Sequence, residues 1–174
     1  MNTIAKHVIL PALLAVALSG LGLGEALAAP DSQVSATGHA GFVNTITGNV
    51  IDLSFSAIQH QDGTVTGEFE RRVVTSTGEF VSRIHGTVIC LTVAGNIARI
   101  GGIIRESSGS AAPPGTDVFT TVVDNGQGEN DLDDLAAPGG SGPPGTALTF
   151  CATGVSRFLF PVTTGNIQVR PTGL

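Results

Sequence analysis

The chain has 174 residues, a formal net charge of −6, 41% hydrophobic residues and 13% charged residues. This length fits one domain, and the low charge combined with this hydrophobic content argues against a globally disordered chain. The acidic balance argues against a nucleic-acid binder, which needs clustered Lys and Arg to neutralise phosphates.

Residues 1–28 have the pattern of a secretory signal peptide. Lys6 supplies the positive start, an apolar run follows, and residues 26–28 (Ala-Leu-Ala) have the small-x-small form of a cleavage site. A membrane anchor is the alternative, but Pro and Gly residues interrupt the run before it reaches a comfortable spanning length. We therefore expect a secreted or periplasmic protein in which residues 29–174 form one domain, with no membrane span after cleavage. Lys6 is the only Lys, so the mature chain has no lysine nucleophile.

From residue 33 onward, apolar and polar residues alternate with a period of two between turn residues, as in strands joined by hairpins. Asp62-Gly63 has the sequence of a tight hairpin turn, and Gly86 is expected to mark a bulge within a long strand. The strands expected from this pattern cover residues 34–43, 49–59, 64–74, 80–93, 97–105, 117–123, 147–152 and 165–170.

Eight short antiparallel strands without helices indicate an all-β fold. We expect an eight-stranded up-and-down β-barrel, because closure removes exposed sheet edges, with a β-sandwich as the alternative. Two long loops, 106–116 and 124–146, are expected to flank the strand at 117–123. The interior of such a barrel is either filled by side chains or able to hold one small ligand.

Cys90 and Cys151 are the only cysteines. In an oxidising compartment they most simply form one disulfide. A reactive thiol is the alternative, but neither residue has a near neighbour that would favour a thiolate, and no C-x-x-C motif is present.

The second long loop is rich in acidic residues and Gly, a composition that suits Ca²⁺ coordination by hard oxygen ligands. Its candidate metal ligands are Asp124, Asp131, Asp133 and Asp134. The spacing does not match an EF-hand, and a solvated acidic turn is the simpler interpretation. We therefore expect no cofactor, with a weakly bound Ca²⁺ ion at this loop as the alternative.

Arg71 shares the strand parity of Phe69 and Val73, so the alternation points its side chain toward the apolar side of the sheet. A buried Arg must be paired or must serve a ligand, which makes Arg71 a candidate anion-binding residue. The more ordinary alternative is a register slip that places Arg71 in solvent and Arg72 inside. His85 lies within an expected strand and is the second candidate ligand-binding residue, although a surface or hydrogen-bonded role is more common for an isolated His.

Three segments carry a resemblance to a known group of proteins. Residues 86–102 (GTVICLTVAGNIARIGG) look like the central hairpin of small exported bacterial β-rich proteins of unknown function, and residues 122–126 and 165–170 are similar to other parts of that group. Related domains accompany cell-surface anchoring modules in longer proteins. The resemblance implies a β-rich exported domain, and it lends no catalytic residue.

The function that we expect is an exported, non-catalytic β-barrel module for binding or cell-envelope interaction, with an unknown protein or a small apolar ligand as its partner. One alternative is a small-ligand carrier or a barrel cyclase or isomerase, in which Arg71 and one of His39, His60 and His85 supply the polar groups of an internal cavity. Another is an exported protease inhibitor. A deep cavity around Arg71 would favour a carrier or an enzyme, whereas a filled interior with an exposed apolar patch would favour a partner-binding module.

Overall fold

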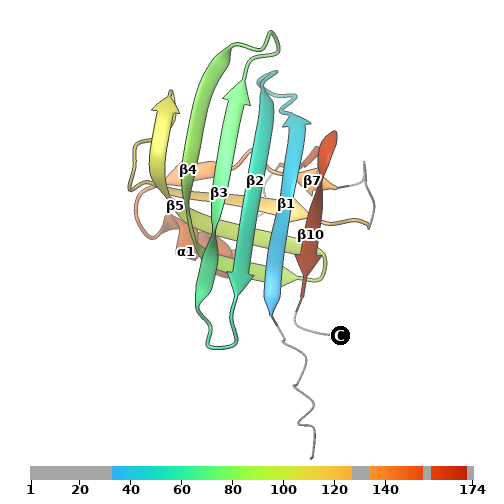
Figure 1. The fold of residues 1–174 in the computed structure, drawn as a ribbon, viewed down its shortest axis with the longest axis vertical. Coiled ribbons are helices and arrows are strands. Elements are labelled where there is room, and N and C mark those ends of the chain that lie inside the picture. Colours follow the sequence, from blue (N-terminus) through green and yellow to red (C-terminus); the bar gives the residue numbers. More distant parts are fainter. Residues whose placement is uncertain (1–32, 127–133, 155–157, 172–174) are drawn as a thin grey trace, which may run out of the picture.

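A computed structural model of the protein describes residues 33–126, 134–154 and 158–171. The described residues form an antiparallel sheet that curls as half a barrel, together with one short helix (Figure 1). The elements are β1 (Val34–Val43), β2 (Val50–Gln59), β3 (Val65–Val74), β4 (Phe80–Ala94), β5 (Ile97–Gly109), β6 (Asp117–Val123), β7 (Leu135–Ala136), β8 (Gly140–Gly142), α1 (Thr146–Thr153), β9 (Phe160–Pro161) and β10 (Thr164–Arg170). The prediction of an all-β fold is confirmed.

The strands follow one another as a meander, in the order β10-β1-β2-β3-β4-β5-β6-β7-β9, and β8 pairs with β6. The long strands β4 and β5 run from the front of the molecule into the layer behind it, where the strands cross those in front (Figure 1). The register between β4 and β5 shifts at His85/Gly86 and again between Val88 and Cys90. Bulges bend a strand and increase its twist, so they let one sheet form both layers. The predicted bulge at Gly86 is confirmed.

The core lies between the two layers and is filled by the inward-facing side chains of both. Alternate residues along β2, namely Ile51, Leu53 and Phe55, are buried, as the period of two requires. Phe42 of β1 stacks on Phe160 of β9, with ring centroids 6.1 Å apart. Apolar burial of this extent is the main stabilising contribution to the fold.

The strands β10 and β9 stand at the two ends of this order, and only Val162 and Thr163 separate them in the sequence. The Thr163 amide donates a hydrogen bond to the Gly41 carbonyl of β1 (2.8 Å). Two carboxylates then bind the edge of β10 that does not face β1. Asp134 accepts the Ile167 N–H and Asp124 accepts the Val169 N–H, both at 2.8 Å. These contacts satisfy edge donors that would otherwise be buried without a partner.

The strand predicted at 147–152 is wrong, because these residues lie in helix α1. Its buried residues are Ala147, Phe150 and Cys151, which have the i, i+3, i+4 spacing of one helical face. A carboxylate oxygen of Asp117 in β6 accepts the Ala147 N–H (3.0 Å), and Gly154 ends the helix in the left-handed conformation (φ 71°).

The predicted loops are shorter or more ordered than expected. Strand β5 continues to Gly109, so the first loop covers residues 110–116 and not 106–116. The region 124–146 contains β7, β8 and the start of α1. Residues 127–133 within it lie outside the described part of the chain.

The predicted disulfide between Cys90 and Cys151 is present and joins α1 to β4, with Cα atoms 6.3 Å apart. Around it, the two cysteines and Ala147 form a small buried cluster apart from the main core. Gly101 of β5 makes room for this contact, because a Cβ there would lie 2.5 Å from the Cys90 sulfur. Within the described residues, no helix is both long and apolar enough to cross a membrane.

Candidate functional site

Arg71 lies near the middle of β3 with its side chain inside the curled sheet. Its register partners are Leu53 on β2 and Ile84 on β4, both of which are buried, whereas the neighbouring Arg72 is exposed. The predicted inward orientation of Arg71 is therefore confirmed, and the alternative in which Arg72 lies inside is wrong.

Arg71 lines a pocket between the two layers of the sheet, with a cavity of about 30 Å³. The other lining residues are Leu53, Phe55, Phe69, Ile84, Ile100, Gly102, Val118, Phe119, Thr120, Pro138, Gly139 and Gly140. The hydroxyl of Thr120 is already used, because it donates to the Ala137 carbonyl (3.0 Å). Among these lining residues, Arg71 is the only one with a titratable side chain.

The guanidinium group of Arg71 is only partly satisfied. Its Nη1 donates to the Pro138 carbonyl (2.9 Å), whereas its Nε is buried without a hydrogen-bond partner. The ion pairs between described residues do not include Arg71. Burial among apolar side chains lowers the pKa of Arg71 below its ordinary value, because desolvation disfavours the charged form. The pocket therefore contains a guanidinium group without a counter-charge among the described residues.

Two segments shape the space around this guanidinium group. Gly139 adopts a left-handed conformation (φ 79°), and a Cβ there would lie 3.0 Å from Nη1 of Arg71, so Gly lets the backbone approach the charge closely. Gly102, another lining residue, leaves room for the ring of Phe69, because a Cβ on Gly102 would lie 2.5 Å from that ring. The shape of the pocket thus depends on glycine at both of these positions.

Replacing Arg71 with Met is expected to raise the free energy of unfolding by about 1 kcal/mol. Removing a buried, unpaired charge relieves a desolvation penalty of several kcal/mol, and this outweighs the lost hydrogen bond to Pro138, worth about 1.5–3 kcal/mol. Chemical denaturation of R71M and wild type measures the difference. The control is R72M on the exposed face, which should change stability by less than about 0.5 kcal/mol. A clear loss of stability in R71M would show that the charge is compensated in the folded protein.

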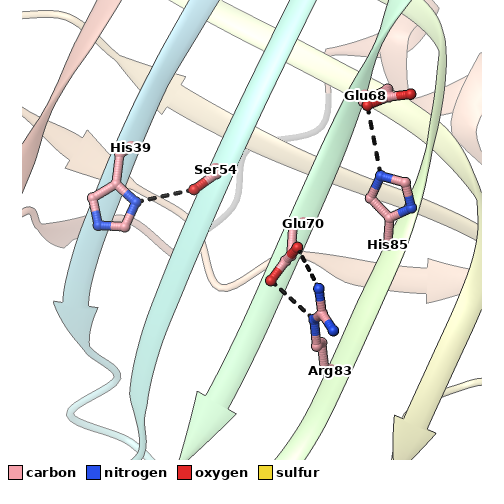
Figure 2. A network of polar contacts seen from close by, with 6 residues as sticks. All are labelled: His39, Ser54, Glu68, Glu70, Arg83 and His85. Carbon is pink, nitrogen blue, oxygen red and sulfur yellow. Dashed lines mark hydrogen bonds and ion pairs between the residues drawn. The ribbon is translucent and has the colours of Figure 1, made fainter.

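His85 does not accompany Arg71. It follows the inward-facing Ile84 on β4 and points to the outer face of the sheet, where its Nε2 lies 3.7 Å from a carboxylate oxygen of Glu68 (Figure 2). It also lines an outer groove of about 230 Å³ with Arg83, Glu106, Ser107 and Ser108. The structure therefore places the two predicted ligand-binding residues on opposite faces of one sheet.

The other two candidate histidines also lie away from the pocket. The Nδ1 atom of His39 is 3.0 Å from the Ser54 hydroxyl, on the outer face (Figure 2). At the β2–β3 hairpin, Nε2 of His60 is 2.9 Å from the Thr66 hydroxyl. None of the three expected partners of Arg71 in a catalytic cavity lines its pocket.

The outer face carries one well-formed ion pair, between Glu70 of β3 and Arg83 of β4 (Figure 2). Arg83 donates to both carboxylate oxygens, from Nε (2.9 Å) and Nη2 (2.8 Å). This bidentate contact lowers the pKa of Glu70 below its ordinary value and raises that of Arg83. Both side chains are largely exposed, so the pair contributes little to stability.

Replacing Arg83 with Gln is expected to raise the pKa of Glu70 toward its ordinary value of 4.5. A lowered folded-state pKa contributes stability that is present above the unfolded value and is lost as the pH falls through the folded value. In R83Q, less stability should therefore be lost as the pH falls. Side-chain NMR titration of the Glu70 carboxyl measures the shift, and R72Q serves as the charge-matched control. An unchanged Glu70 pKa in R83Q would contradict the contact.

The described acidic residues of the predicted Ca²⁺ loop have structural partners. Asp134 is fully buried and accepts the N–H groups of Asn125 (2.9 Å) and Ile167, and Asp124 accepts those of Val169 and Gly126 (3.3 Å). The other two candidate ligands, Asp131 and Asp133, lie outside the described residues. Across the described part of the chain, no three His, Cys, Asp or Glu side chains group in a way that could hold a metal ion.

Figure 1 shows the end of the sheet where β1 and β3 stop and β2 and β4 begin. The outer face of the sheet carries an apolar row at this end. It consists of Val43, Val50, Val74 and Phe80, which are register partners in that order across the four strands. Val43 is 43% and Phe80 52% exposed. This outer apolar row is one feature of the described residues that fits a partner-binding module, because contiguous exposed apolar side chains mark interaction surfaces.

The sequence predicts the buried Arg71 of the pocket but not the segment that packs against it. Pro138, Gly139 and Gly140 fall in a segment that is expected to be a loop, and the Pro138 carbonyl contacts Arg71 across 67 residues of chain. No local pattern signals such a contact.

Comparison with known proteins yields no relative: no family model matches the chain, and no curated protein and no solved structure is significantly similar to it.

Proposed function

We propose that the protein is an exported, non-catalytic module that binds a small molecule in the pocket around Arg71. The observation that carries this proposal is the guanidinium group in an otherwise apolar pocket, with its Nε buried and unpartnered. A charge in such a place is unfavourable unless a ligand neutralises it. Proteins keep locally unfavourable groups chiefly at functional sites.

Binding fits the pocket better than catalysis. General acid–base catalysis needs a group whose pKa lies near the working pH, such as a His or a tuned carboxyl group. The pocket-lining residues include neither, and the three candidate histidines have partners elsewhere. The cyclase or isomerase alternative therefore loses the second polar group that it requires.

Export is supported by the signal-like residues 1–28 and by the disulfide between Cys90 and Cys151. A disulfide of this kind persists in a periplasm or outside the cell, where thiols are oxidised. The resemblance to domains beside cell-surface anchoring modules favours a place at the cell envelope.

The test is an NMR titration of the ¹⁵N-labelled mature protein with two probes, benzoate and the uncharged benzamide. We expect saturable shift changes, for at least one probe, at the backbone amides of pocket residues such as Gly102, Val118 and Gly140. The variant V118F, which fills the pocket from β6, should lose them, and V118I serves as a milder version. Absence of saturable changes with both probes up to their solubility limits would reject the proposed function.

A further inference from the structure

We propose that the ligand of this pocket is a small monocarboxylate with an apolar body, held by the Nε edge of Arg71. This inference rests on the proposed function and adds the chemical class of the ligand. Three properties of the pocket lead to it: its single charge, the free donors of that charge, and the size and polarity of the space around it.

The charge of the pocket selects a monoanion. Arg71 is the only charged side chain among the lining residues, so one negative charge gives a neutral bound pair. A dianion such as sulfate or a dicarboxylate would leave one uncompensated charge among apolar side chains. An uncharged ligand would leave the guanidinium group as unsatisfied as it is in the free protein.

The free donors of Arg71 match a carboxylate. Its Nη1 is held by the Pro138 carbonyl at 2.9 Å, which fixes one side of the guanidinium group. Its Nε is buried without a partner. The Nε and the neighbouring Nη2 of a guanidinium group present two nearly parallel N–H donors, which fit the two oxygens of a carboxylate. A spherical halide uses this fork less well, because it offers one acceptor and not two.

The space and its walls define the rest of the ligand. The cavity of about 30 Å³ has room for roughly two water molecules, or for the carboxylate group of a ligand alone. The pocket is partly open and not enclosed, so the apolar body of the ligand extends from the carboxylate along its open side. Phe55, Phe69 and Phe119 contribute to the walls, and among the lining residues the one polar hydroxyl, on Thr120, is already bonded. A hydroxylated body such as that of a sugar acid would lose its hydrogen bonds to water here, whereas an apolar body would not.

The experiment compares matched acids and amides by the same ¹⁵N NMR titration of the mature protein. Benzoate is expected to bind roughly tenfold or more tightly than benzamide, because a charge-assisted hydrogen bond contributes about 1.5–3 kcal/mol. Acetate should bind more weakly than benzoate, because it lacks the apolar body. Chloride, sulfate and phosphate at equal ionic strength should not displace benzoate.

Three variants assign the effect to Arg71. R71M should abolish the preference for benzoate over benzamide while its spectrum remains that of a folded protein. R71K keeps the charge but loses the planar fork, so it should retain only part of the preference. R72M removes a charge from the next residue on the outer face and should leave benzoate binding unchanged, which controls for net charge.

The outcomes separate this inference from the proposed function on which it rests. Equal binding of benzoate and benzamide in the pocket would overturn the carboxylate and leave small-molecule binding intact. Displacement of benzoate by sulfate at lower concentration would overturn the monoanion, and equal competition by chloride or phosphate would overturn the carboxylate fork. Binding of neither organic probe would reject both proposals. Preference for benzoate that persists in R71M would move the site away from Arg71 and contradict the inference.

Discussion

Replacing Asp134 with Ala is expected to lower the free energy of unfolding by about 4 kcal/mol, since it removes the acceptor of two backbone N–H groups. Asp134 is fully buried, and its two oxygens bind the amides of Asn125 and Ile167. Each buried donor left without an acceptor costs about 1–3 kcal/mol. Since small domains are stable by only about 5–15 kcal/mol, this loss is a large part of the total.

The substitution D134N keeps the size and shape of the side chain but leaves it only one acceptor oxygen. One amide oxygen can still accept an N–H, but the amide nitrogen would face the second N–H donor. We therefore expect D134N to fall between wild type and D134A. Denaturant unfolding followed by circular dichroism measures all three, with E79A in the exposed β3–β4 turn as the control for loss of an acidic residue. A D134A protein as stable as E79A would show that Asp134 does not hold β10.

The role of Asp134 also shows which contacts a sequence cannot reveal. Acidic residues spaced between glycines predict a solvated turn or a weak Ca²⁺ loop, because nearby residues offer no other partner. The partner of Asp134 is the backbone of Ile167, 33 residues further along the chain, and that of Asp124 is Val169, 45 residues away. Only the curling of the sheet brings the two carboxylates to β10. The composition of the loop cannot show that its carboxylates bind backbone N–H groups at the far end of the chain.

The strands themselves can be predicted because their signal is local. The alternation that places Arg71 on the side of Phe69 and Val73 depends on nothing beyond the pleat of a single strand. The run from Thr146 to Thr153 has no such unambiguous signal, because its apolar residues fit a period of two and a helical face equally well. Strands of two or three residues, such as β7 and β9, are too short to show any period and depend on their neighbours.

The pocket can be predicted from the sequence only in part. Strand parity is enough to identify the buried charge, but the Pro138 carbonyl that binds it and the glycines that make room for it come from tertiary packing. His85, the second candidate ligand-binding residue, does not line this pocket, because parity on the neighbouring strand turns its side chain outward. Arg71 pairs with Ile84, so the next residue along β4 must face outward. The period of two, applied to both strands of the hairpin at once, separates Arg71 from His85.

Removal of the disulfide is expected to lower the free energy of unfolding by about 4 kcal/mol, because Cys90 and Cys151 close a loop across 61 residues of chain. The double variant C90A/C151A tests this without leaving a buried hydroxyl or an unpaired thiol. Wild type under a strong reductant should unfold at the same denaturant concentration as the variant does. The reductant should leave the variant itself unchanged, which controls for other effects of the reagent.

The loss should begin at α1, because this short helix is the element that the disulfide ties to β4. The disulfide cluster around Cys151 is separate from the main core, and a helix of eight residues is only marginally stable by itself. In C90A/C151A we expect amide hydrogen exchange to accelerate most in α1, while the strands β1–β3 lose protection only by the drop in global stability and stay the most protected. Because Phe150 of α1 stacks on Phe119, a lining residue of the pocket, at 4.7 Å between ring centroids, loosening the helix should also weaken benzoate binding. Acceleration no larger in α1 than in the strands would instead show that the disulfide stabilises the whole fold and not the helix in particular.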